Sequence, residues 1–129
     1  MEVAEQLSIF LENKPGVLAR VCEALAEAGV NIRAVCVADT VDHAVVRLVA
    51  ADSPRARDIL ERGGALVVET DVIMLCVPNR PGSLAGIARK LAAAEVNIEY
   101  AYGSTDPGRP EGILVLRVDD IERARATIG

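Results

Sequence analysis

Apolar residues in this chain follow two different spacings, and the order of the spacings repeats. In residues 6–12, Leu7, Ile9 and Leu11 occupy every second position, which is typical of a strand with one buried face. In residues 18–25 they recur at i, i+3, i+4 and i+7, which predicts a helix with one buried stripe. Residues 84–91 repeat the helical spacing, and in the apolar run before them Ile73, Leu75 and Val77 stand at the places of Leu7, Ile9 and Leu11. We therefore predict two related units, each beginning with a strand and a helix.

The amino-acid letters repeat as well as the pattern. The stretch NKPGVLARVCEALAEAGVNI begins at Asn13, and NRPGSLAGIARKLAAAEVNI begins at Asn79. When residues 13–34 are compared with residues 79–100, eleven of the twenty-two positions are identical and no gap is needed. Agreement of this extent indicates two copies of one structural unit.

The remaining segments complete each copy. After each helix, two β-rich segments separated by turn residues predict an antiparallel hairpin, within residues 30–50 and 96–118. A second helix follows at DSPRARDILERGG, with a Ser or Asp cap and two closing glycines, and DDIERARATIG is its weaker counterpart. ALVVETD then adds a fourth strand to the first copy. The predicted fold class is α+β, with two ferredoxin-like βαββαβ units in tandem, antiparallel sheets and the helices on one face.

The junction between the two copies carries no linker. ALVVETD runs directly into VIMLCV, so residues 65–77 are predicted to form one strand about 43 Å long at roughly 3.3 Å per residue. We assign residues 1–70 to the first domain and residues 71–129 to the second, which is C-terminally short because its second helix is not followed by a strand. The second sheet then lacks its last strand and has an open edge. We expect the first unit or another chain to cover that edge.

The N-x-P-G stretches at residues 13–16 and 79–82 mark the starts of the two long helices. The asparagine is predicted to accept a hydrogen bond from first-turn amides, and the proline to lie near the first helical position, where its missing N–H is not needed. The glycine allows another molecule to approach the backbone closely. Capping of this kind is also a common purely structural role, so a structural and a binding interpretation both stay open for these residues.

Composition excludes several classes of partner. Nineteen acidic and fourteen basic residues give a formal net charge of -5, and the basic residues are scattered along the chain. Only three residues are aromatic, which is too few to stack a series of bases, so no nucleic acid partner is expected. No apolar run reaches the roughly 18 residues that cross a bilayer, and MEVAEQ does not resemble a signal sequence. We therefore expect no membrane partner and a cytoplasmic location.

Side chains suited to catalysis or metal binding are sparse. Cys22, Cys36 and Cys76 fall within apolar patterns without CxxC spacing, so they are predicted to be reduced core residues. The only histidine, His43, falls in the predicted turn TVDHA, and a surface role is favoured for it. No metal site is expected. The sequence holds no Ser-His-Asp or Cys-His set and no phosphate loop, so we predict no enzymatic activity and no cofactor.

The joint pattern of strand, N-x-P-G turn, amphipathic helix, V-N-I and strand, present twice, resembles ACT domains, which are small ligand-sensing modules on enzymes of amino-acid metabolism. The resemblance covers nearly the whole chain and is greatest to stand-alone tandem ACT proteins, which carry no catalytic domain. It implies a non-catalytic regulatory or sensor protein that binds a small molecule, which in this family is an amino acid. The alternative is a ligand-free interaction module that docks on a metabolic enzyme through its sheet edge or sheet face.

The resemblance also implies where a ligand binds. In amino-acid-binding ACT domains, the asparagine before the P-G turn and the asparagine that opens the second strand contact the ligand, often across an interface between two ACT units. The neighbouring turn, first-turn and strand residues complete the site. The candidate ligand-binding residues of this chain are therefore Asn13, Pro15, Gly16, Val17, Leu18, Asn31, Ile32, Asn79, Pro81, Gly82, Ser83, Leu84, Asn97 and Ile98.

The residues before the two turns bear on the identity of the ligand. Serine-binding members place a histidine two residues before the first asparagine, whereas this chain has Leu11 and Val77 there. Either the ligand is a more apolar amino acid, or the site reads mainly the backbone end of the ligand. Tyr100 and Tyr102 share one face of a predicted strand, where packing is favoured over lining the ligand.

The strand face that points away from the helices bears on oligomerisation. At the second copy that face of the first strand presents Val72, Met74 and Cys76, which are all apolar, and at the first copy it presents Gln6, Ser8 and Phe10. An apolar face of this kind is expected to be buried against another sheet or another chain, which favours a homodimer.

Overall fold

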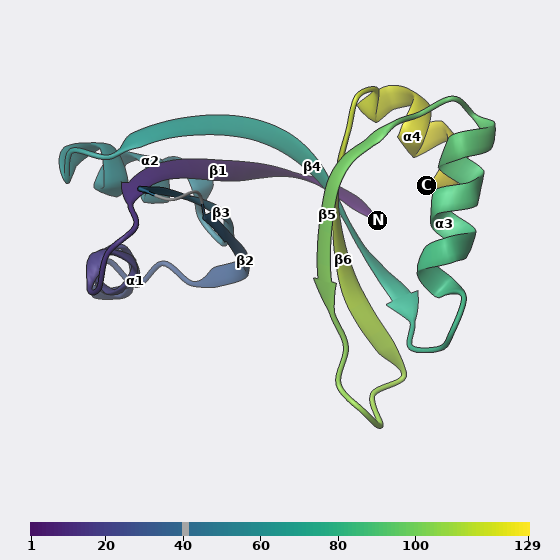
Figure 1. Ribbon diagram of the computed structural model, residues 1–129, viewed down its shortest axis with the longest axis horizontal. Coiled ribbons are helices and arrows are strands. Elements are labelled where there is room, and N and C mark those ends of the chain that lie inside the picture. The colour runs from purple at the N-terminus through teal and green to yellow at the C-terminus, as the bar shows by residue number, and fades with distance from the viewer. Residues whose placement is uncertain (40–41) are drawn as a thin grey trace. The chain divides into compact units, whose positions relative to one another are not determined.

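The structure, a computed structural model, describes residues 1–39 and 42–129. The described residues form six strands and four helices (Figure 1). In chain order these are β1 (Glu2–Glu12), α1 (Val17–Glu27), β2 (Ile32–Asp39), β3 (His43–Ala50), α2 (Ser53–Arg62), β4 (Leu66–Pro78), α3 (Ser83–Ala93), β5 (Ile98–Ser104), β6 (Glu111–Val118) and α4 (Ile121–Ile128). Hydrogen bonds join the strands in the order β2-β3-β1-β4-β6-β5. The predicted α+β fold of ferredoxin-like units is confirmed.

Each of two compact units contains four strand segments and two helices. The N-terminal unit is Glu5–Thr70, in which the strand order is β2-β3-β1-β4. The C-terminal unit is Asp71–Gly129 together with Met1–Ala4, in which the order is β5-β6-β4-β1. Met1–Ala4, at the start of β1, therefore lies beside β4 and takes the position that a strand after α4 would fill. The expected cover of that edge comes from the N-terminal end of β1.

The longest strand, β4, runs through the junction between the two sequence copies. It extends without interruption from Leu66 to Pro78, which confirms the continuous strand that the missing linker predicted. β1 is longer than its alternating pattern indicated, because Glu2–Gln6 continue the strand without an apolar alternation. Both long strands contribute residues to both units.

A separate core fills each unit between its sheet and its two helices. Leu7, Ile9 and Leu25 lie in the first core, and Ile73, Val77 and Leu91 lie in the second. The alternating and helical spacings therefore identified the buried faces correctly. Leu18 and Leu84 depart from the predicted stripes, since 42% and 52% of their surface is exposed. They lie in the first turns of α1 and α3, and neither belongs to a core cluster.

The sheet face away from the helices is partly buried within the single chain. Val72 and Met74 are buried, as their apolar character predicted, and Cys76 is exposed. Gln6 and Ser8 are buried too, although they are polar. No buried side-chain nitrogen or oxygen among the described residues lacks a hydrogen-bond partner. Because Val72 and Met74 are already covered in one chain, their apolar character is no argument for a second copy.

The cysteines and the histidine are only partly as predicted. All three cysteines are free, but Cys22 and Cys36 are half-buried and Cys76 is exposed, so the prediction of core cysteines was wrong for Cys76. His43 is the first residue of β3 and is exposed. The first part of the predicted turn TVDHA, residues 40–41, lies outside the described residues.

The four helices begin in two different ways. At α2 and α4 the side chains of Asp52 and Asp120 accept hydrogen bonds from the backbone N–H groups of Arg55 and Arg123, at 3.2 and 2.9 Å. At α1 and α3 the cap position is held by a glycine in the left-handed region, which has no side chain to accept a hydrogen bond. The predicted cap position was therefore wrong, because Gly16 and Gly82 occupy it instead of Asn13 and Asn79. The prolines also lie one residue before the cap position instead of in the first turn. No helix among the described residues is long and apolar enough to cross a membrane.

We predict opposite effects for two Gly→Ala substitutions at α3. Gly82 has φ +91°, which an L-residue adopts only with strain, so Gly82→Ala should destabilise the protein by about 1–2 kcal/mol. Gly86 lies inside the helix with nothing within 4 Å of an added Cβ, so Gly86→Ala should stabilise it by about 0.5–1 kcal/mol. Urea denaturation followed by circular dichroism measures both changes. A stabilising effect of Gly82→Ala would contradict the left-handed turn.

Candidate functional site

The two N-x-P-G turns place a helix N-terminus at the surface of each unit. Gly16 and Gly82 have φ values of +87° and +91°, and a Cβ at either would meet nothing within 4 Å. The space over each turn is therefore open to another molecule. The Gly16 and Gly82 caps offer no side-chain acceptor and neither first turn holds an acidic residue, so no carboxylate on these turns offsets the positive end of the helix dipole. The N–H groups of Val17 and Ser83 already donate to the Lys14 and Arg80 carbonyls, so a ligand would have to use the N–H groups that follow them.

Most of the candidate residues from the sequence lie at the surface. Half-buried side chains are found at Val17, Ile32, Asn79, Ser83 and Ile98. Exposed positions are Asn13, Pro15, Gly16, Leu18, Asn31, Pro81, Gly82, Leu84 and Asn97. The N-x-P-G residues of one unit are adjacent in sequence and lie together. Asn31 and Asn97, which precede the second strand of each unit, lie elsewhere.

The two asparagines of each unit lie at opposite ends of its sheet. The Asn13 N–H donates to the Asp42 carbonyl before β3, whereas the Asn31 carbonyl accepts from the Ala51 N–H after β3. β3 is eight residues long, so the two positions are separated by roughly 25 Å. The same holds for Asn79 and Asn97, which are bonded to Pro110 and Asp119 on either side of β6. A single amino acid is far too short to touch both asparagines of one unit.

Asn79 fixes the long loop between β5 and β6. Its side-chain Nδ2 donates to the carbonyl oxygens of Asp106 and Arg109, at 2.9 and 2.8 Å. Its backbone N–H donates to the Pro110 carbonyl at 3.0 Å. Both amide hydrogens are therefore committed to the loop, and the side chain has only its Oδ1 left to offer a ligand. The sequence repeat could not indicate that Asn79 holds this loop, because the repeat ends at residue 100 and the loop between β5 and β6 begins after residue 104.

We predict that Asn79 and Asn97 differ in their contribution to stability. Asn79→Ala removes two hydrogen bonds and should lower the free energy of unfolding by about 1–2 kcal/mol. The Asn97 side chain makes no hydrogen bond within the described part of the chain, so Asn97→Ala should change stability by less than about 0.5 kcal/mol. Chemical denaturation and amide hydrogen exchange in residues 105–110 test this. Equal effects of the two substitutions would show that the Asn79 bonds do not hold the loop.

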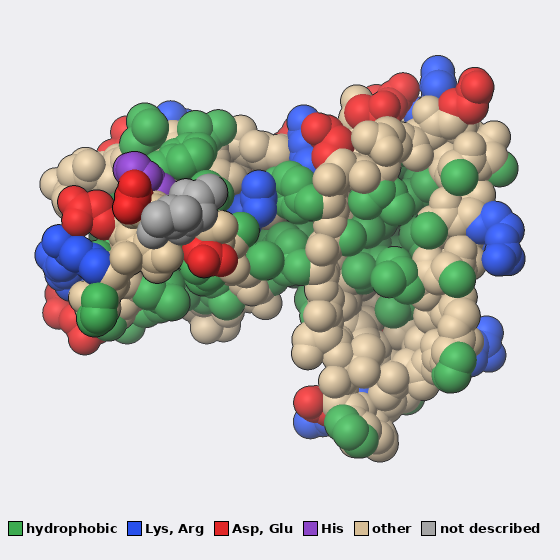
Figure 2. Space-filling model, in the orientation of Figure 1, with side chains coloured by type: hydrophobic (Ala, Val, Ile, Leu, Met, Phe, Trp, Pro, Cys, Tyr) green, Lys and Arg blue, Asp and Glu red, His purple; other side chains and the backbone are tan. Residues whose placement is uncertain are grey.

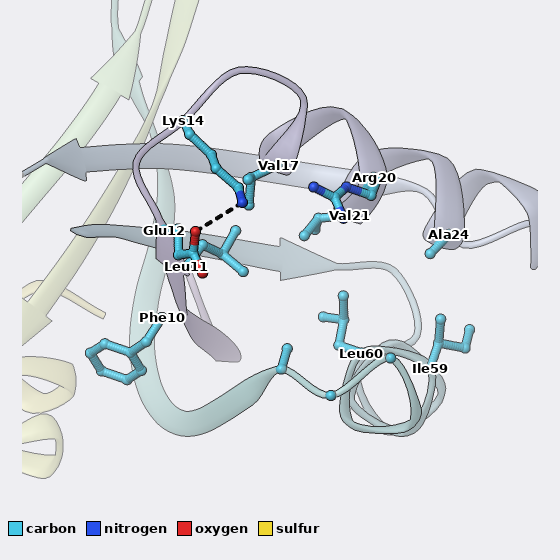
Figure 3. Close-up of a pocket in the computed structure, with 13 residues that line it drawn as sticks. Phe10, Leu11, Glu12, Lys14, Val17, Arg20, Val21, Ala24, Ile59 and Leu60 are labelled. Atoms are coloured by element: carbon cyan, nitrogen blue, oxygen red, sulfur yellow. Dashed lines mark ion pairs between the residues drawn. The ribbon is translucent and has the colours of Figure 1, made fainter. Parts of the chain in front are cut away.

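A cavity of about 590 Å³ opens between α1 and α2 in the N-terminal unit (Figure 3). The end of β1 and the N-x-P-G turn form one wall, and α1 and the end of α2 form the others. This cavity was not predicted from the sequence. A hairpin separates α1 from α2 in the chain, and local sequence patterns do not specify that two such helices pack together. Its lining residues are Phe10, Leu11, Glu12, Lys14, Val17, Arg20, Val21, Ala24, Ile59, Leu60, Gly63, Gly64 and Ala65.

Charged side chains surround the mouth of this cavity. The Lys14 ammonium lies 3.0 Å from a carboxylate oxygen of Glu12 (Figure 3). This hydrogen bond and the charge of Lys14 hold the pKa of Glu12 below its usual range, with smaller contributions from His43 and Arg20. The guanidinium of Arg20 has no hydrogen bond or ion pair of its own within the described residues. Of the two cationic side chains that line the cavity, Lys14 is paired with Glu12, and Arg20 has no carboxylate within 4.0 Å among the described residues.

Apolar surface in the C-terminal unit lies beside the second turn. Figure 2 shows hydrophobic side chains between β5 and α3. A cavity of about 310 Å³ there is lined in part by Leu84, Tyr102 and Leu114. Tyr100 and Tyr102 pair with Arg117 and Val115, so both rings lie on one face, as their spacing predicted. That face is the one away from the helices, since the alternate residues Leu114 and Leu116 lie in the core. Within the described residues no group of three His, Cys, Asp or Glu side chains is arranged to hold a metal ion.

Comparison with known protein families identifies the family to which this chain belongs. The profile of the ACT domain pair family matches residues 1–128. This chain belongs to the ACT domain pair family. The resemblance inferred from the repeated N-x-P-G and V-N-I motifs is therefore confirmed. A comparison with curated proteins found no match.

Several solved structures are similar to this chain. A protein from Bacteroides thetaiotaomicron is 36% identical, with a TM-score of 0.92 over 98% of this chain and 86% of that one. The regulatory subunit of aspartate kinase from Thermus thermophilus, in a ligand-free form, is 18% identical, with a TM-score of 0.75 over 99% and 93% of the two chains. The corresponding subunit from Thermus flavus is 20% identical, with a TM-score of 0.69 over 98% and 92%. At these lower identities, the two aspartate kinase subunits share the fold with this chain.

Proposed function

We propose that this ACT domain pair is a non-catalytic regulatory protein that binds an amino acid at its N-x-P-G turns. Residues 1–70 and 71–129 are its two ACT domains, the protein acts in the cytoplasm, and the fourteen candidate residues given above supply the site. The observation that carries the proposal is the contrast between the helices: α2 and α4 are capped by aspartates, whereas α1 and α3 begin at exposed glycines without a side-chain cap.

The chemistry of an amino acid suits such a helix start. Its carboxylate needs N–H donors, which the uncapped first turns of α1 and α3 offer. Its ammonium group needs oxygen acceptors, and the side-chain amide oxygens of the nearby asparagines provide them. The turn needs no net charge, because the ligand itself is a zwitterion. The regulatory subunits of aspartate kinase share this fold, which supports the proposal that amino-acid binding here controls an enzyme.

A second copy of the chain is part of the proposal. Because the two asparagines of one unit lie at opposite ends of β3 or β6, one amino acid can touch both types only if another ACT surface supplies the second. β2 is an edge strand that exposes Val35 and Val37, at 49% and 47% of their surface. Exposed apolar side chains beside unpaired backbone groups are the features through which two copies associate. We therefore propose a homodimer.

A thermal-shift screen against the twenty amino acids tests the proposal. A ligand present at about 100 times its Kd should add about 2.7 kcal/mol, which raises the Tm by several degrees in a chain of this length. We expect a shift for one amino acid or a small related group, with apolar side chains favoured because Leu11 and Val77 precede the turns. The Asn31→Ala and Asn97→Ala variants, whose side chains make no hydrogen bond in the described structure, should fold normally and lose the shift.

The alternative function is a ligand-free module that docks on a metabolic enzyme through its sheet edge or sheet face. The exposed Val35 and Val37 on the edge strand β2 favour it. No amino acid would shift the Tm of such a protein. Replacing Val35 and Val37 by threonine would weaken its association with the enzyme partner and leave the fold intact.

A further inference from the structure

The cavity between α1 and α2 differs in chemistry from the surface of the N-x-P-G turns. Val21, Ala24, Ile59 and Leu60 give it apolar walls, and α1 faces α2 across it (Figure 3). Its volume of about 590 Å³ falls within the range of small-molecule sites. Ile59 packs only partly into the core beneath, so an apolar guest would remove further surface of this side chain from water.

The charges at its mouth favour an anion without an ammonium group. Glu12 is the only carboxylate in the lining, and Lys14 already holds it at 3.0 Å. Arg20 lines the same cavity and its guanidinium has no ion pair or hydrogen bond among the described residues. A carboxylate can accept two parallel hydrogen bonds from a guanidinium, whereas an ammonium group would find no unpaired acceptor side chain there.

We propose that this cavity is a second binding site, for a small aliphatic carboxylate that carries no amino group. The carboxylate pairs with Arg20, and the hydrocarbon chain lies against Val21, Ile59 and Leu60. The site is separate from the amino-acid site proposed for the turns, although Val17 lies beside both.

The second sequence copy lacks the same chemistry. Sixty-six positions after Arg20 and Ala24 the chain carries Gly86 and Lys90. The C-terminal unit thus has no cation at the position of Arg20, and a long charged side chain replaces the small Ala24 on the wall. One site per chain follows from this difference.

Titration of the isotope-labelled protein with 4-methylpentanoate, followed by amide chemical shifts, tests the proposal. We expect saturable shifts confined to the ends of β1 and α2 and to α1. Leucine is the matched control, because it has the same carbon chain and carboxylate plus an ammonium group, and 4-methylpentylamine reverses the charge. 4-Methylpentylamine should shift none of these amides, and leucine should leave those at the end of α2 unshifted, because binding at the N-x-P-G turn reaches only the end of β1 and the start of α1. 3-Methylbutanoate, which is one methylene shorter, should bind about fourfold more weakly.

Two variants locate the site independently. Arg20 is exposed on α1, so Arg20→Gln should fold normally and weaken binding of 4-methylpentanoate by about tenfold. Ala24→Leu keeps a strong helix former and places three further carbon atoms in the part of the cavity beside Arg20, so it should weaken binding of 4-methylpentanoate. Arg89→Gln, an exposed arginine on α3, should leave the affinity unchanged.

The results separate this site from the amino-acid site. Equal affinities of the wild type and the Arg20→Gln variant for 4-methylpentanoate would overturn the proposal, as would shifts of the same amides by 4-methylpentylamine. Absence of any saturable shift with 4-methylpentanoate up to 50-fold molar excess at about 10 mM would overturn it too. The Asn31→Ala and Asn97→Ala variants, which test the amino-acid site, should bind 4-methylpentanoate as the wild type does.

Discussion

Leu91→Ala should lower the free energy of unfolding of the C-terminal unit by about 3–5 kcal/mol. The Leu91 side chain is fully buried and packs in one core with Ile73, Leu114 and Leu116. Its replacement by alanine loses the transfer free energy of the removed atoms and leaves a cavity, because strands and helices on all sides limit the collapse of the site. Guanidinium denaturation followed by circular dichroism measures the loss.

Leu84→Ala is the matched control on the same helix. Half of the Leu84 surface is exposed, so its truncation should cost less than about 1 kcal/mol. If Leu84 also contacts a bound amino acid, the same variant should weaken ligand binding without weakening the fold. Equal destabilisation by the two variants would mean that the first turn of α3 is buried in solution, by a second copy or otherwise.

The elements that sequence reasoning located are those with a strong local pattern. Leu7, Ile9 and Ile73, which stand at matching alternate positions of the two copies, identified the helix-covered faces of β1 and β4, because side chains two apart on a strand share a face. Asp52 and the glycines at 63–64 set both ends of α2, since capping depends on residues adjacent in sequence. The uninterrupted β4 followed from the absence of any Gly, Pro or Ser between its halves.

Features that depend on distant residues were not predictable from those patterns. Asn79 was expected to cap a helix, but its amide instead bonds to Asp106 and Arg109, which are separated from it by α3 and β5. The left-handed glycines take the cap position, because the P-G turn reverses the chain immediately before the first helical residue. The cavity at Arg20 requires the packing of α1 against α2, which periodicity within either helix does not specify.

Removal of Met1–Ala4 should destabilise the C-terminal unit by about 2 kcal/mol or more. These residues form the fourth strand segment of that unit, beside β4. Their loss removes several backbone hydrogen bonds, each with a net value of about 1 kcal/mol, and leaves the edge of β4 unpaired. Amide exchange should accelerate at the residues of β4 from Asp71 onward that do not bond to β6. Exchange in the hairpin of β2 and β3 should stay slow.

Val3→Thr provides the control for the truncation, because it keeps the backbone and the strand propensity and changes only a side chain that is 37% exposed. It should alter stability by less than about 0.5 kcal/mol. An unpaired edge also recruits other strands, so the truncated protein should associate into larger species on size-exclusion chromatography, whereas Val3→Thr should elute as the wild type does. Unchanged exchange in β4 after truncation would show that Met1–Ala4 does not pair there. The C-terminal unit would then hold together on three strands, and its stability would depend on the core around Leu91 alone.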